Sequence, residues 1–182
     1  VLIIVCDNTD LSEIVYEKIS GEEIVDIPSE DGKGGIHKVV YGKSSILPDL
    51  QNSDGTQHTV RIDSKLLAKI ETEEGETQDE AAQALRLLIG SIGKRGGPGE
   101  HVRCVVSVSM LTEGWDATNV THILGIRAFG SQLLCEQVVG RGLRRMNYTP
   151  DRKTGLLPPE HVDVYGIPFS LIPYKGRVKD EK

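Results

Sequence analysis

The chain has 182 residues, of which 38% are hydrophobic and 26% charged, and its formal net charge is −6. This length suits one domain with a sizeable core, and the composition is ordinary for a globular protein. The acidic balance excludes a wholly basic nucleic-acid coat, so any contact with nucleic acid must be local.

Apolar runs and cysteines indicate an intracellular protein. No apolar run approaches the roughly eighteen residues of a membrane span, and the opening run lacks the flanks of a signal peptide. Cys6, Cys104 and Cys135 form no Cys-x-x-Cys pair, and the histidines lack His-x-x-x-His spacing. We expect three buried thiols, no metal site, no membrane contact and a cytoplasmic location.

The chain opens with a predicted strand and helix. Val1–Val5 is a continuous apolar run, typical of a strand that is covered on both faces. Asp10 is a candidate cap for the next helix, whose apolar spacing runs to a stop at Gly21. Over residues 28–58 we predict a mostly irregular insertion, with little periodicity except at Ile36–Tyr41.

Strands and helices alternate along the rest of the chain. We expect, in order, a strand at 59–63, helices at 64–70 and 77–92, strands at 102–108 and 121–126, a helix at 131–145 and a strand at 162–167. This order predicts a single α/β domain over residues 1–182, with a doubly wound, mainly parallel sheet and helices on both faces. Ligands of such sheets bind at the carboxyl ends of the strands.

A polar turn, Thr-Glu-Gly-Trp-Asp, follows the predicted strand at 102–108. Gly114 would let the backbone approach a ligand closely, and Asp116 can accept a hydrogen bond from a sugar hydroxyl or an arginine. A tight turn anchored by Trp115 in the core explains the same residues equally well.

One glutamine and two arginines share a predicted helix face further on. Gln137, Arg141 and Arg144 stand at i, i+4 and i+7, beside Gly140. Guanidinium groups bind phosphate oxygens in a bidentate way and can stabilise charge on a transferring γ-phosphate. The alternatives are a solvated basic helix end, favoured by the helix dipole, or a plain RNA-binding patch.

Together the two segments resemble motifs V and VI of superfamily-two helicases and translocases. A strand, Thr-Glu-Gly-Trp-Asp, a strand and Gln-x-x-Gly-Arg-x-x-Arg occur in that order within residues 102–145. The sequence of these segments is similar in particular to that of the restriction (Res) subunit of type III restriction enzymes, and Val1–Thr9 looks like motif IV. The resemblance implies a RecA-like fold and the second motor domain of an ATP-dependent DNA helicase or translocase.

The resemblance also implies roles for single residues. The arginines that would reach ATP, as catalytic fingers, are Arg141 and Arg144. Further nucleotide-facing positions are Gly114, Asp116, Gln137 and Gly140. Positions that match contacts with the nucleic-acid strand are Asn8, Thr9, Ser64, Lys65 and Thr112.

Two sequence features of a complete ATPase are absent. The chain has no Gly-x-x-x-x-Gly-Lys-Ser/Thr loop and no Asp-Glu-x-His-like acidic box, and it also lacks a nuclease signature. We therefore expect a fragment, which opens inside a strand without a starting Met, and whose ATP and Mg²⁺ are bound mainly by a first RecA-like domain of the same parent chain. DNA cleavage would belong to another part of that parent.

The implied partners are double-stranded DNA, that first domain and a methyltransferase subunit. Residues 28–58 could contact the methyltransferase, although a solvated loop is the simpler interpretation. Three other hypotheses stay open: the equivalent domain of a repair or type I restriction motor, a non-enzymatic nucleic-acid-binding module, and a nucleotide-binding regulatory domain.

Overall fold

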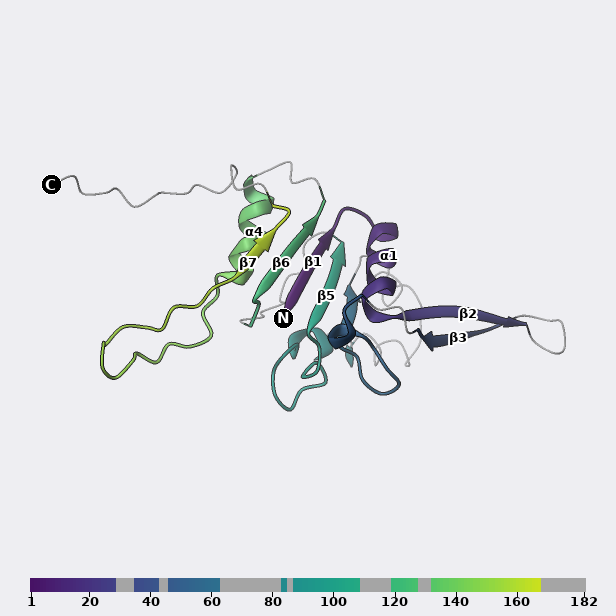
Figure 1. Cartoon of the computed structure of the whole chain (residues 1–182), viewed down its shortest axis with the longest axis horizontal. Helices are drawn as coiled ribbons and strands as arrows, with labels where there is room; N and C mark the ends of the chain where they lie inside the picture. The colour runs from purple at the N-terminus through teal and green to yellow at the C-terminus, as the bar shows by residue number, and fades with distance from the viewer. Residues whose placement is uncertain are drawn as a thin grey trace.

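The computed structural model describes residues 1–28, 35–42, 46–62, 83–84, 87–108, 119–127 and 132–167. Five strands form one sheet in the order β4-β5-β1-β6-β7 (Figure 1). They are β1 (Leu2–Cys6), β4 (Thr59–Ile62), β5 (Cys104–Val108), β6 (His122–Ile126) and β7 (Asp163–Tyr165). All neighbouring pairs are parallel, which confirms the predicted α/β, RecA-like doubly wound sheet.

β1 is the central strand and is covered on both faces. Ile3 and Val5 point to one face and Ile4 and Cys6 to the other, and none of the four is more than 3% exposed. A strand with two covered faces needs an apolar side chain at every position, which explains the continuous apolar run in the sequence.

Helices cover both faces of the sheet. α1 (Thr9–Ser20) packs through Ile19 against the face that carries Ile4 and Cys6. α4 (Gln132–Gly142) packs on the opposite face together with residues 87–92, whose helical part is followed by the predicted stop at Gly93, with φ 67°. Among the helices that the structure describes, none is long and apolar enough to cross a membrane. The expected helix at 64–70 and the start of the one at 77–92 lie outside the described residues.

The cap of α1 differs from the prediction. Asn8, not Asp10, is the cap: its backbone is extended and its side-chain oxygen accepts a hydrogen bond from the N–H of Leu11 at 2.8 Å. Asp10 lies inside the first turn, where an acidic residue interacts favourably with the helix dipole. The predicted helix end is confirmed, since Gly21 takes a left-handed conformation and donates to the carbonyl of Glu17 at 2.9 Å.

A β-hairpin extends away from the parallel sheet (Figure 1). It consists of β2 (Glu22–Pro28) and β3 (Gly35–Tyr41), which pair antiparallel. The expected exception at Ile36–Tyr41 corresponds to β3, whereas β2 was not predicted. In the later part of the predicted insertion, the described residues 46–58 form a short 3-10 helix, η1 (Pro48–Leu50), and an isolated bridge between Ser53 and Thr56.

Candidate functional site at the end of α4

α4 runs between the carboxyl ends and the amino ends of the parallel strands, called here the carboxyl edge and the amino edge of the sheet, and it contains most of the glutamine and arginine segment. It follows β6 and runs back toward the amino ends of the parallel strands (Figure 1). An 11-residue helix spans about 16 Å, similar to the length of a five-residue strand. The end of the motif therefore lies at the amino edge of the sheet, whereas sequence reasoning favoured the carboxyl edge for ligands.

Gly142 lets the end of α4 approach the sheet closely. A Cβ atom at this position would lie 2.7 Å from Cγ2 of Val162 and 3.0 Å from Cδ1 of Ile123. The helix ends here, three residues before the predicted end at Arg145. Arg144 and Arg145 thus lie beyond the helix, and the predicted shared face of Gln137, Arg141 and Arg144 does not extend to Arg144.

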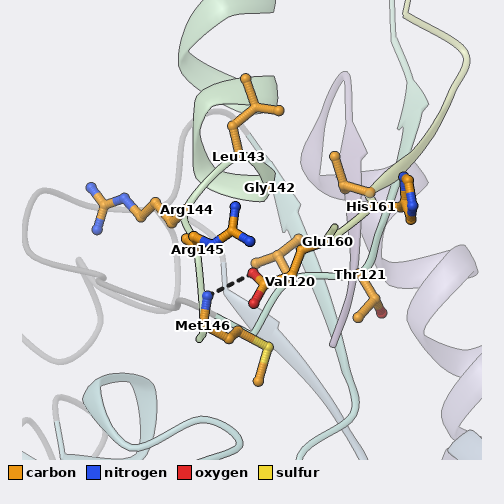
Figure 2. A pocket seen from close by; sticks show the side chains of 10 residues that line it. Val120, Thr121, Gly142, Leu143, Arg144, Arg145, Met146, Glu160 and His161 are labelled. Carbon is orange, nitrogen blue, oxygen red and sulfur yellow. Dashed lines mark hydrogen bonds between the residues drawn. The ribbon is translucent and has the colours of Figure 1, made fainter. Parts of the chain in front are cut away.

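The end of α4 borders a cavity of about 240 Å³ (Figure 2). Three segments line it: residues 120–121 before β6, residues 142–146 at and beyond the end of α4, and residues 160–162 before β7. The lining combines apolar side chains such as Val120 and Val162 with the charged groups of Arg144, Arg145 and Glu160.

Glu160 binds the backbone just beyond the helix. Its Oε2 accepts from the N–H of Met146 and its Oε1 from the N–H of Asn147, both at 2.8 Å. The hydrogen bond from Met146 holds the pKa of the Glu160 carboxyl below its ordinary value, with smaller help from Asn147 and from the charge of Arg145. Both oxygens of the carboxylate are thus used in hydrogen bonds to the backbone of Met146 and Asn147.

The two arginines beyond the helix have different surroundings. Arg145 is half-buried and donates from Nε to the carbonyl of Asn147 at 2.9 Å and from Nη2 to the carbonyl of Pro158. Arg144 is exposed, and its side chain extends away from Arg145 and Glu160 (Figure 2). Arginine beside a helix C-terminus is favoured by the helix dipole.

The other expected site residues are spread over the two edges of the sheet. Gln137 and Gly140 are exposed on α4, and Arg141 lies in its last turn. Asn8 and Thr9 lie at the carboxyl edge, where the Asn8 side chain is used as the helix cap. The expected residues outside the described ranges are Ser64, Lys65, Thr112, Gly114 and Asp116.

Sequence reasoning missed Glu160 and one ion pair. Glu160 contacts residues 13 and 14 positions away, and a lone glutamate before a strand carries no sequence signal. At the carboxyl edge, Asp7 follows β1 and Arg127 follows β6, and they pair at 3.9 Å between Oδ1 and Nε. Both follow strands that the sequence predicted, at Val1–Val5 and 121–126, but only the sheet order brings the two residues together.

Within the described ranges, no group of three or more His, Cys, Asp or Glu side chains is placed to hold a metal ion. Comparison with models of protein families and with curated proteins finds no match to this chain. The site presents the exposed side chain of Arg144 at the rim of the cavity and holds the guanidinium of Arg145 on two backbone carbonyls.

Proposed function

We propose that this chain is the second RecA-like motor domain of an ATP-dependent DNA helicase or translocase of the type III restriction class. One observation carries the proposal. The Gln-x-x-Gly-Arg-x-x-Arg segment occupies the end of a helix that follows a strand of a parallel α/β sheet, and its last arginine, Arg144, is exposed at the sheet edge.

The chemical contribution of this domain is positive charge. Arg141 and Arg144 approach the γ-phosphate of ATP held mainly by the first motor domain, and Gln137 and Gly140 line the same side. A guanidinium keeps its charge and its planar donor geometry, so it stabilises the charge that develops on the transferring phosphoryl group. The phosphate cradle and the Mg²⁺ ligands belong to the first domain, because this sequence has no phosphate-binding loop.

The carboxyl edge of the sheet is the proposed DNA side. Asn8 and Thr9 stand there at the start of α1, and the length of α4 separates them from its arginine end by about 16 Å along the strand direction. By the resemblance, Ser64, Lys65 and Thr112 add contacts to the strand, and Gly114 and Asp116 link it to the nucleotide. The proposal includes double-stranded DNA and a methyltransferase subunit as partners, and a cytoplasmic location.

Arginine substitution in the full-length protein tests the proposal. Arg144→Ala and Arg141→Ala should each lower kcat for DNA-stimulated ATP hydrolysis by about 10³- to 10⁵-fold, because the guanidinium acts mainly in the transition state. DNA affinity should change little, since many weak phosphate contacts share it. Arg152→Ala, on the exposed loop between α4 and β7, is the matched control and should retain full turnover.

The opposite pattern would contradict the finger assignment. Variants that keep normal turnover but lose DNA affinity, together with part of its salt dependence, would identify Arg141 and Arg144 as strand-binding residues. The chain would then be a nucleic-acid-binding module.

A further inference from the structure

We propose that Arg145 and Glu160 are a positioning pair that fixes the direction of Arg144, an inference that rests on the proposed function. The role of Arg144 requires its guanidinium to meet a phosphoryl group held by another domain. The chain around it must therefore present this side chain in one direction, and the contacts on both sides of Arg144 do so.

On the upstream side, α4 holds the chain. The N–H of Leu143 still donates to the carbonyl of Val139 at 3.2 Å, as a continuation of the helix. Gly142 packs tightly against Val162 and Ile123. The backbone that enters Arg144 is therefore fixed to the sheet.

On the downstream side, Glu160 holds the chain. Its two carboxylate oxygens accept from two successive N–H groups, those of Met146 and Asn147. Glu160 itself stands three residues before β7, which pairs with β6. The backbone that leaves Arg144 is thus tied to the same sheet as the backbone that enters it.

Arg145 closes the arrangement. Its guanidinium bonds the carbonyls of Asn147 and Pro158, so it links the chain leaving α4 to the chain approaching β7. Its positive charge also acts on the Glu160 carboxylate. With Arg145 directed inward and Arg144 outward (Figure 2), the two neighbours have separate tasks: one braces the turn and the other faces the substrate.

Such bracing matters because a catalytic group must be held close to its productive geometry. A displacement of about 1 Å can lower a rate by about 100-fold. A side chain that leaves a braced backbone also loses less conformational freedom when it engages its ligand.

The test compares single and combined variants of the full-length protein. Glu160→Ala should lower kcat for ATP hydrolysis by about 10- to 100-fold with little change in KM, since a misdirected Arg144 affects mainly the transition state. Glu160→Gln, which keeps one acceptor oxygen, should lie between Glu160→Ala and the wild type. Arg145→Ala should resemble Glu160→Ala.

Two controls separate positioning from a general structural effect. Glu100 also accepts a backbone N–H, from Gly96 at 2.8 Å, on an exposed loop before β5, so Glu100→Ala removes a similar bond elsewhere. It should leave kcat unchanged and lower the thermal midpoint by less than Glu160→Ala does, because it removes one such bond and Glu160→Ala removes two. In an Arg144→Lys background, whose residual rate is measurable, Glu160→Ala should lower kcat by less than about 3-fold, because the two changes remove one function.

The outcomes are distinguishable. If Glu160→Ala lowers kcat equally in the wild-type and Arg144→Lys backgrounds, it acts independently of Arg144 and the positioning role is wrong. If it leaves kcat unchanged while Arg144→Ala removes turnover, the positioning role is also wrong but the motor function stands. If Arg144→Ala itself leaves turnover unchanged, the proposed function fails.

Discussion

A single buried amide, that of Asn52, joins three segments of the molecule. The side chain is fully buried, and its Oδ1 accepts from the N–H groups of His58 and Thr59 at 2.8 Å. Its Nδ2 lies 2.9 Å from Glu22 Oε1, 2.9 Å from the Thr59 carbonyl and 3.3 Å from the Tyr16 hydroxyl. Asn52 thereby fixes the base of the β2–β3 hairpin to α1 and β4.

Loss of this amide should destabilise the chain strongly. Asn52→Ala leaves the buried N–H of Thr59 and the part-buried N–H of His58 without their acceptor, so we expect the free energy of unfolding to fall by about 3 kcal/mol. Urea unfolding monitored by circular dichroism measures this loss. Asn147→Ala is the control, because Asn147 is exposed and its side chain accepts only from the N–H of Thr149 among the bonds described; a fall as large as that of Asn52→Ala would contradict the account.

The titration of the Glu160 carboxyl should reveal the hydrogen bonds that it accepts. Because its native-state pKa is depressed, its contacts stabilise the fold above the unfolded-state pKa and this contribution is lost as the pH falls through the native-state pKa. The amide resonances of Met146 and Asn147 should therefore titrate with a midpoint below that of an ordinary glutamate. In Glu160→Gln this titration should disappear, and a midpoint at or above the ordinary value would refute the assignment.

At the scale of elements, the sequence predicted those whose own residues determine them. β1 is apolar throughout and β5 is apolar except at Ser107, because both faces of each strand are covered, and that burial is visible as an almost continuous apolar run. β2 is different: Glu22, Glu23 and Asp26 interrupt its apolar residues, and the strand depends on its register with β3. Such pairing is a contact between distant residues and leaves no local pattern.

The end of α4 was equally hidden. Helical spacing continues through Arg144, whereas the helix ends at Gly142, where the chain packs closely against Ile123 and Val162, residues distant in the sequence. The site shares this limit. Motif order marked Arg144 as a candidate, whereas the hydrogen bonds of Glu160 just beyond it join residues 13 to 14 positions apart.

Two glycines of α4 should respond to substitution in opposite ways. Gly142→Ala should lower the free energy of unfolding by about 1–3 kcal/mol, since its Cβ would overlap Val162. Gly140→Ala should raise it by about 0.5–1 kcal/mol, because nothing lies within 4 Å of the added methyl group and alanine favours the helix. Denaturant unfolding of both variants measures these changes. Equal changes in the free energy of unfolding would show that α4 does not pack against β6 as described.

At the scale of the whole molecule, the 182-residue chain should not act as an ATPase by itself. It lacks the phosphate-binding loop and the acidic box that would supply the phosphate cradle and the Mg²⁺ ligands. We expect ATP hydrolysis no faster than a buffer blank in a phosphate-release assay with Mg²⁺ and DNA. Turnover that Arg141→Ala abolishes would mean that this chain contains a complete site.

Under the proposed motor function, the parallel sheet would act as a lever arm. Within the body formed by the sheet and its helices, the arginine end and the Asn8 turn lie about 16 Å apart along the strand direction. A turn of this body by about 12° about its amino edge carries the opposite edge through about 3.4 Å, the rise per nucleotide along one DNA strand. A small rotation about the arginine end would therefore move the carboxyl ends of the strands by about the length of one nucleotide step.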